Sequence, residues 1–396
     1  MLRSLNSHEE QDTDHQHNPS HGLSSPAHHM RQLLISCAEL ISQSDLASAR
    51  RMVSLLFTRS SPDGDSTERL VQQFTIALSM RLNAHNFIPT DSGAVQSSYL
   101  SLNQITPFIR FSHLTANQAI LEAVEGHSSI HIIDFDTMQG VQWPPLMQAI
   151  AERSDPSNPP SIRITGTGHD METLRRTGDR LQKFACSLGI NFHFHPLQIP
   201  HDTSPSAAAV LRLLPSSIAI LPDEVLAVNC VLYLHKLLSD DSRNVRLFLR
   251  TIKAMNPKVV TVAEREGNHN HPIFLQRFIE ALDYYTAVFE SLDATLPPAS
   301  KERHDVEQIW LGKEIANIVA AEGEERMERH ERFESWMEIM RSSGFSNLPL
   351  SPFALSQAKL LLRLHYPSVG YQLRLLHDSF FLGWMNKPLF SVSSWY

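Results

Sequence analysis

The sequence has few cysteines and no long apolar run. Cys37, Cys186 and Cys230 lie far apart in the 396 residues and form no CxxC pair, which excludes a disulfide scaffold and a thiolate zinc site. This usage fits a reducing compartment. No apolar run approaches the roughly 18 residues of a membrane span, and the N-terminus carries charges and histidines where a secretory leader is apolar. We therefore expect neither a secreted protein nor a membrane partner.

Basic charge is also scarce. The chain has 34 Lys and Arg against 42 Asp and Glu, a net charge of −8, and its longest basic runs are Arg50-Arg51 and Arg175-Arg176. An autonomous DNA-binding protein usually presents a basic face, and these runs are too short for an import signal. Arg50, Arg51 and nearby Arg59 would neutralise too few phosphates for useful affinity. The composition predicts that any contact with DNA is indirect.

Residues 1–29 differ from the rest of the chain. They hold six of the 21 histidines, no aromatic residue and only five apolar residues. Such a segment buries too little surface to offset its ordering entropy, so we expect a disordered tail. The irregular spacing of its histidines favours a flexible polar leader over a metal site.

Residues 30–126 have a helical pattern. Apolar residues recur at three- and four-residue steps, and Asp45, Asp65 with Glu68, and Thr115 with Gln118 stand where helix caps are expected. We interpret this unit as a helical cap. Its leucines fit core packing better than an exposed dimer zipper. The apolar stripes that these residues form along the helices are too short for a long coiled coil.

From residue 127 the pattern predicts strands that alternate with helices. This alternation is typical of βαβ units, so we expect a Rossmann-type, doubly wound, mainly parallel sheet with antiparallel strands at the C-terminal edge. The expected strands are 130–135, 161–165, 191–195, 225–228, 258–263, 371–375, 380–384 and 390–395. The expected helices are 142–153, 171–187, 206–214 and 242–255. Between 301 and 341, charged residues at i,i+4 spacing, such as Glu325–Arg329 and Glu328–Arg332, favour a solvated helix with internal pairs.

Ligands of an open parallel sheet bind beyond the carboxyl ends of its strands. The first expected strand ends at Asp134, and a nucleotide site would then need a glycine-rich turn, but only Gly140 follows. Gly166 and Gly168 follow the second strand, and a GxG alone is weak evidence for a ligand. We interpret these four residues as a vestigial cleft and expect no cofactor.

Other signatures of chemistry are weak. The HxH pairs at 193–195 and 269–271 lack a third ligand, so we expect no metal site. The sequence has no GxSxG, HExxH or P-loop motif, and therefore no candidate catalytic residue. The triplet 264–266, Glu-Arg-Glu, fits an internal ion pair better than an acid–base couple.

Several motifs in order along the chain resemble those of the GRAS family of plant transcriptional regulators. Residues 130–134, IHIID, resemble the VHIID motif with Ile in place of Val, and 30–120 and 171–207 resemble the two leucine-rich regions. In the PFYRE region, 278–285 fit the FY element, and 313–314 carry Lys in place of the Arg of RE. The single residues that match motifs are Ile130, His131, Ile132, Ile133, Asp134, Pro257, Trp336, Gly344, Leu376, Trp384, Ser393, Ser394 and Trp395.

The resemblance implies that 30–396 form one GRAS domain. It would comprise the helical cap at 30–126 and an α/β core at 127–396, with part of 281–325 contributing to the cap. It implies a nuclear protein that regulates transcription, here in the initiation of lateral shoots. The implied partners are DNA-binding transcription factors, including zinc-finger proteins, and other GRAS proteins in homo- or heterodimers. A methyltransferase-like enzyme or a small-molecule sensor that uses the sheet-end cleft is the alternative, since fold alone does not define function.

Overall fold

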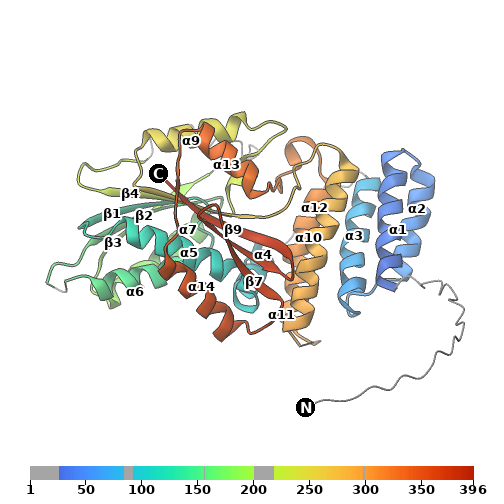
Figure 1. Ribbon diagram of the computed structural model, residues 1–396, viewed down its shortest axis with the longest axis horizontal. Helices are drawn as coiled ribbons and strands as arrows, with labels where there is room; N and C mark the ends of the chain where they lie inside the picture. The colour runs from blue at the N-terminus through green and yellow to red at the C-terminus, as the bar shows by residue number, and fades with distance from the viewer. Residues whose placement is uncertain (1–25, 84–91, 156, 200–217, 298) are drawn as a thin grey trace, which may run out of the picture.

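The computed structural model describes residues 26–83, 92–155, 157–199, 218–297 and 299–396. Within them lies a nine-stranded sheet in the order β3-β2-β1-β4-β5-β9-β8-β7, with β6 paired to β9 (Figure 1). The strands are β1 (Ser129–Asp134), β2 (Ser161–Gly168), β3 (Asn191–Gln198), β4 (Val225–Val231), β5 (Val259–Arg265), β6 (Asn347–Leu348), β7 (Tyr371–Leu376), β8 (Ser379–Trp384) and β9 (Lys387–Trp395).

The first five strands are mutually parallel, whereas β9, β8 and β7 continue the sheet antiparallel. This confirms the predicted mainly parallel sheet with an antiparallel C-terminal edge. β1 lies near the middle of the parallel part, where its apolar side chains reach both faces of the sheet. The pairing aligns Asp134, the last residue of β1, with Asn229 of β4, so both side chains meet at the carboxyl end of β1.

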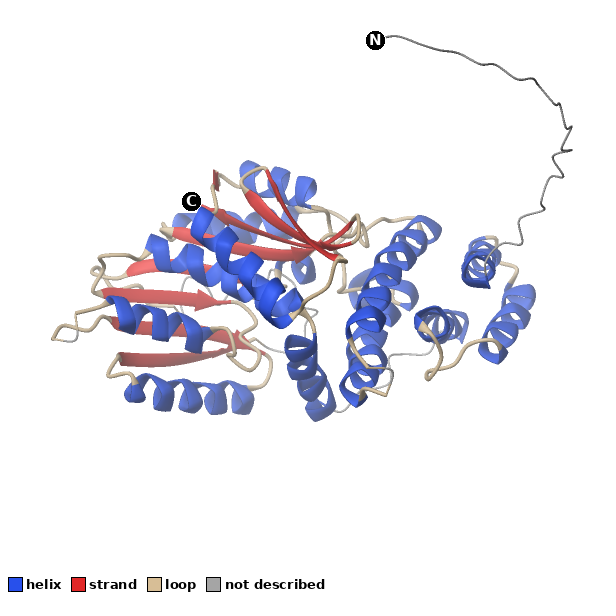
Figure 2. Cartoon of the chain, turned by 60° about the horizontal axis from the view of Figure 1, so that its bottom comes forward, coloured by secondary structure: helices blue, strands red, loops and turns tan. Residues whose placement is uncertain are grey.

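Helices cover both faces of the sheet (Figure 2). On one face α5 (Pro107–Ala123), α6 (Trp143–Arg153) and α7 (Met171–Ser187) pack against Ile130 and Ile132 of β1. On the other face α9 (Arg243–Ala254) and α13 (Phe333–Ser342) pack around Ile133. Helix α14 (Pro352–His365) lies against α5, on the first face. The two cores explain why β1 is apolar on both sides, as expected for a buried parallel strand.

The helical cap lies at one end of the molecule (Figures 1 and 2). It contains α1 (Pro26–Ser42), α2 (Leu46–Thr58), α3 (Ser66–Asn83) and α4 (Ser92–Ile105), joined by α10 (Phe274–Thr295), α11 (Lys301–Asp305), the π-helix η2 (Val306–Leu311) and α12 (Gly312–Ala320). The Phe74 and Phe278 rings meet edge to face at 5.4 Å, and Arg69 Nε lies 2.9 Å from Glu307 Oε2 in a buried ion pair. The later helices thus complete the core of the N-terminal ones.

Two of the predicted caps are confirmed. Asp45 Oδ1 accepts the Ser48 N–H at 3.1 Å, and Asp65 Oδ1 accepts the Glu68 N–H at 2.9 Å. The third is wrong: Thr115 lies inside α5, which runs unbroken from Pro107 and packs against the sheet as well as against α4 of the cap. Pro107 at the helix start is the stronger signal, because its fixed φ suits the first turn.

The predicted solvated helix across 301–341 is also wrong. This stretch contains α11, η2, α12, the short 3-10 turn η3 (Gly323–Glu325), an irregular segment at 326–332, and then α13. In the irregular segment Arg326, Arg329 and His330 are buried, and both arginines lie against Asp240. Helix α1 begins at Pro26, within the segment expected to be a tail. The rest of that tail and the helix expected at 206–214 fall outside the described residues.

In the part of the chain that the structure describes, no helix is long and apolar enough to cross a membrane.

Candidate functional site

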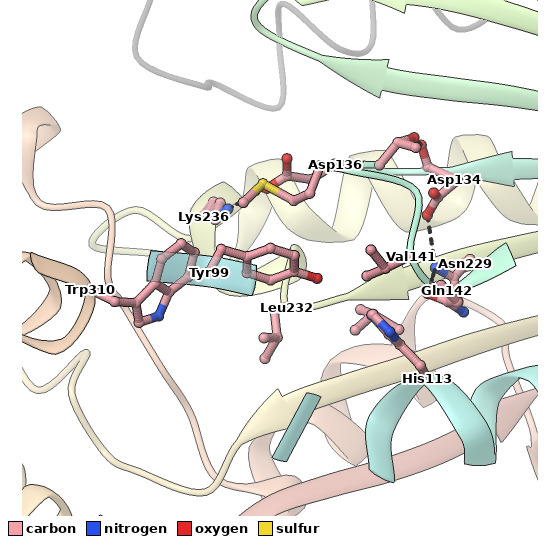
Figure 3. A pocket seen from close by; sticks show the side chains of 13 residues that line it. Tyr99, His113, Asp134, Asp136, Val141, Gln142, Asn229, Leu232, Lys236 and Trp310 are labelled. Atoms are coloured by element: carbon pink, nitrogen blue, oxygen red, sulfur yellow. Dashed lines mark hydrogen bonds and ion pairs between the residues drawn. The ribbon is translucent and has the colours of Figure 1, made fainter. Parts of the chain in front are cut away.

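The carboxyl end of β1 is occupied by a buried polar network (Figure 3). Asp134 is 3% exposed; its Oδ2 accepts the indole N–H of Trp143 at 2.8 Å, and its Oδ1 accepts the Asn229 side-chain N–H at 2.8 Å. Gln142 donates to Asn229 Oδ1 at 3.0 Å and to Asn117 Oδ1 at 3.1 Å. Both carboxylate oxygens of Asp134 are therefore engaged by the protein itself.

Burial raises the pKa of Asp134 to about 7, although the donors from Asn229, Trp143 and Thr137 work against the shift. Burial also raises the pKa of nearby Asp136, but the ammonium of Lys236, 2.5 Å away, outweighs it and leaves the pKa of Asp136 below its usual value. Asp136 is thus an ionised partner of Lys236, whereas Asp134 changes its charge near neutral pH.

The cavity beside this network is small. Tyr99 and Trp310 of the cap, together with His113 of α5, close it on the side away from β1 (Figure 3). Its volume is about 50 Å³, which is room for a few water molecules. Pockets for ligands of nucleoside size measure roughly 300–1,000 Å³. The described residues therefore leave no space for adenosylmethionine or a nucleotide at this end of the sheet.

The candidate cleft glycines are surrounded by side chains. A Cβ on Gly140, whose φ is +64°, would lie 2.6 Å from Thr177, and one on Gly166 would lie 2.5 Å from Phe194. At Gly168 the nearest atom, from Leu174, would be 3.3 Å away. Gly140, in the loop after β1, packs against α7, and Gly166 of β2 packs against Phe194 of β3, so close packing accounts for these two glycines without a ligand.

The C-terminal motif residues form a second, separate region. Trp395 is fully buried, and its indole N–H donates to Ser393 Oγ at 2.9 Å, while the Ser394 hydroxyl donates to the Leu348 carbonyl at 3.0 Å. Trp384 is 4% exposed and lies against Gly370, but Leu376 is half exposed at the end of β7.

The remaining motif residues also lie apart from Asp134. Trp336 is buried in α13, Gly344 follows that helix with φ +95°, and Pro257 is buried just before β5. These residues anchor the sheet edge and its covering helix. The structure brings none of them to Asp134.

The triplet 264–266 does not form the internal pair that the sequence predicts. Glu264 Oε2 accepts from His235 Nδ1 at 2.7 Å, Arg265 pairs with Glu314, and Glu266 Oε2 accepts the Phe333 N–H at 3.2 Å. Alternate residues of a strand point to opposite faces, so three neighbours in a strand cannot share one pair.

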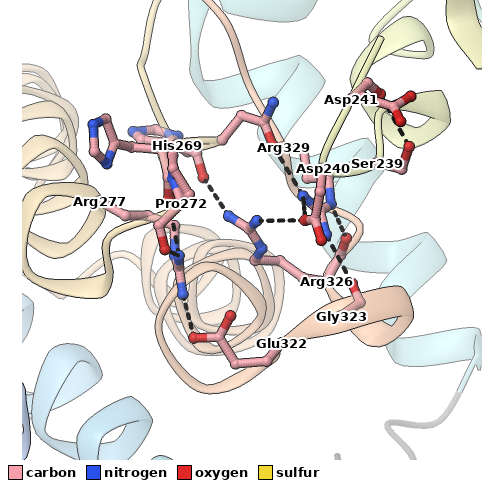
Figure 4. Close-up of polar contacts among 12 residues, drawn as sticks. Ser239, Asp240, Asp241, His269, Pro272, Arg277, Glu322, Gly323, Arg326 and Arg329 are labelled. Carbon is pink, nitrogen blue, oxygen red and sulfur yellow. Dashed lines mark hydrogen bonds and ion pairs between the residues drawn. The ribbon is translucent and has the colours of Figure 1, made fainter. Parts of the chain in front are cut away.

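Two polar clusters were missed by the sequence analysis. One contains His235, Glu264, His269, Glu328 and His330. The other is built on Arg326 and Arg329: Arg329 Nη1 donates at 3.0 Å to Asp240 Oδ1 and Nη2 at 2.8 Å to the Gly323 carbonyl (Figure 4). One pattern in the sequence could have indicated the first cluster. His235 follows β4 and Glu264 lies near the end of β5, and these two strands are parallel neighbours.

The fold and this site define a class: a Rossmann-type α/β scaffold whose ligand-binding edge is filled by its own side chains. Comparison with known proteins then gives the family. The GRAS domain family profile matches residues 30–396, and the chain belongs to that family, whose members regulate transcription in plants.

Individual relatives agree with this assignment. Scarecrow-like protein 18 of Arabidopsis thaliana is 50% identical over 92% of this chain and 91% of its own length. Protein MONOCULM 1 of Oryza sativa subsp. japonica is 46% identical over 92% of this chain and 88% of its own. The crystal structure of SCL7 from Oryza sativa superposes with a TM-score of 0.77 at 37% identity, covering 93% of this chain and 99% of that one.

Proposed function

We propose that this protein is a nuclear transcriptional co-regulator that acts by binding DNA-binding transcription factors, in the initiation of lateral shoots. The observation that carries the proposal is the closed sheet end: the strand edge that binds ligands in related architectures holds Asp134, Trp143 and Asn229 bonded to one another. Such a molecule acts through its surfaces. Its net charge of −8 disfavours DNA as the direct partner.

The outward side of α2 fits a protein partner. Leu46 and Phe57 are 44% and 42% exposed, and eleven residues, about three helical turns, place them on the same side of the helix. In α7, which lies in the second leucine-rich region, the exposed residues are mainly charged and the leucines Leu174 and Leu181 are buried. We therefore place the contact with a zinc-finger factor or a second GRAS protein on α2.

A methyltransferase or sensor function is the weaker alternative. It requires the roughly 50 Å³ cavity to open several-fold, which would break the bonds of Asp134 to Trp143 and Asn229. No observation on the described residues favours that opening.

Selection of DNA from a random duplex library by the purified full chain at physiological salt tests the proposal. The chain alone should enrich no sequence, whereas adding a zinc-finger transcription factor should recover that factor's own site with the chain in the complex. The Leu46→Asp/Phe57→Asp variant should lose the joint complex, while the Leu174→Ala variant in α7 should retain it if folded. A sequence motif enriched by the chain alone would contradict the proposal.

A further inference from the structure

Five polar side chains gather beside the carboxyl ends of β4 and β5. His235 comes from the 3-10 turn η1 (Leu234–Leu237), Glu264 from β5, His269 from the loop that follows, and Glu328 and His330 from the irregular segment 326–332. The three histidines and Glu264 are at most 1% exposed, and the Glu328 side chain is 20% exposed. The cluster is therefore built inside the protein, with one edge open to solvent at Glu328.

Three of these side chains point their donor atoms at one place. His235 Nε2 lies 3.3 Å from Glu328 Oε2, and His330 Nε2 lies 3.1 Å from the same oxygen. The three atoms are within 4.8 Å of one another. A tetrahedral Zn²⁺ with bonds of about 2.0–2.1 Å holds neighbouring ligand atoms about 3.3 Å apart, so the observed spacing suits a metal ion.

The remaining ring nitrogens are held by other residues. His235 Nδ1 donates to Glu264 Oε2 at 2.7 Å, and His330 Nδ1 lies 2.9 Å from His269 Nδ1. A histidine that binds a metal through one nitrogen usually has the other hydrogen-bonded in this way, which fixes the tautomer and orients the ring. Both Nε2 lone pairs then face Glu328.

Protons alone do not satisfy the cluster. His330 Nε2 is buried and has no hydrogen-bond partner among the described residues, because its contact with Glu328 lacks hydrogen-bond geometry. The carboxylates of Glu264 and Glu328 both lie against His235, while Arg265 is engaged by Glu314. A divalent cation would engage both Nε2 atoms and the Glu328 carboxylate at once, which a proton on one imidazole cannot do.

We propose that His235, His330 and Glu328 bind a divalent transition-metal ion, Zn²⁺ by ligand type, with Glu264 and His269 positioning the two imidazoles. Water completes the tetrahedron on the exposed side of Glu328. The ion joins the turn after β4 to the irregular segment 326–332, and so fixes the chain between the last helix of the cap and α13. This role is structural and independent of the function proposed above.

Metal content and binding of the full chain test the proposal. The six N-terminal histidines are first replaced by alanine, because they can bind metal without a built site. This protein should bind one Zn²⁺ per chain in a titration with Zn²⁺ alone, and its melting temperature should rise. With Co²⁺ it should show the visible absorption of a four- or five-coordinate site, and X-ray absorption of the Zn²⁺ form should show two imidazole nitrogens.

Two variants and a control decide the outcome. Adding His330→Ala should weaken Zn²⁺ binding at least 100-fold and abolish the thermal shift, whereas His304→Ala, on the surface of α11, should change neither. Glu328→Gln keeps the shape of the side chain but removes its charge. It replaces His330→Ala as the test of Zn²⁺ binding if His330→Ala does not fold. Absence of stoichiometric metal in the tail-substituted protein, or binding unchanged by both variants, would overturn the proposal.

Discussion

Replacing Trp143 by Phe tests whether the end of β1 is a structural anchor. The change removes the indole N–H that donates to Asp134 Oδ2 at 2.8 Å and leaves a fully buried carboxylate oxygen without that donor. At a pH above the pKa of Asp134, about 7, the carboxylate is ionised. A hydrogen bond to a charged group then contributes about 1.5–3 kcal/mol, and the smaller ring adds a packing loss of about 1 kcal/mol. We therefore expect Trp143→Phe to lower the free energy of unfolding by roughly 3 kcal/mol.

Trp336 provides a matched control. It is also buried, but its indole N–H has no hydrogen-bond partner among the described residues, so Trp336→Phe should lose only the packing term. Urea unfolding followed by far-ultraviolet circular dichroism measures both without relying on tryptophan fluorescence. Combined with Asp134→Ala, Trp143→Phe should show a coupling energy of about 1.5–3 kcal/mol. Equal costs for the two tryptophans, or a coupling below about 0.5 kcal/mol, would refute the reasoning.

Three further predictions concern pH, buried charge and packing. Because burial raises the pKa of Asp134 to about 7, the folded state still binds a proton that the unfolded state releases near pH 4. The contribution of this carboxyl to the free energy of unfolding therefore falls as the pH rises from about 4 to 7. In Asp134→Asn protein the free energy of unfolding should lack this decrease with pH. Arg329→Lys should lower the free energy of chemical unfolding by about 2–4 kcal/mol, because a lysine cannot reproduce the hydrogen bonds of the buried guanidinium. Arg332 is exposed beside Glu280, so the control Arg332→Lys should cost less than about 1 kcal/mol. Similar values for the two variants would place Arg329 at the surface. Gly370→Ala places a Cβ 2.3 Å from the Trp384 ring and should lower the free energy of unfolding by about 1–3 kcal/mol. Trp384→Phe in the same protein should partly relieve this loss. A melting temperature unchanged by Gly370→Ala would show that the Trp384 ring moves freely.

The sequence predicts the sheet well because its strands are short apolar runs separated by helical periodicity. The run at 130–135 becomes β1, and the close spacing of the last three runs correctly predicts an antiparallel edge. β6, with two residues, is too short to leave a pattern. The cap is less visible, because α10 and α12 join it from 150 residues or more further along the chain.

The site was harder to predict, because its contacts join distant segments. Local i,i+4 spacing predicted that Glu328 pairs with Arg332. In the structure Glu328 instead lies against His235 and His330, and Arg332 pairs with Glu280. Local pairing contributes only a few tenths of a kcal/mol, so tertiary burial decides the structure of this segment. The sequence shows that the loop after Asp134 lacks the glycines of a nucleotide site. It does not show that Asp134 accepts a hydrogen bond from Trp143.

The end of the sheet beyond β1 is closed by the protein's own side chains. Calorimetric titration of the full chain with S-adenosylmethionine, with S-adenosylhomocysteine as the comparison, tests this claim most directly. A closed sheet end predicts no binding heat at millimolar ligand. Saturable micromolar binding that disappears in folded Asp134→Ala protein would contradict it, and would make the end of β1 a ligand site.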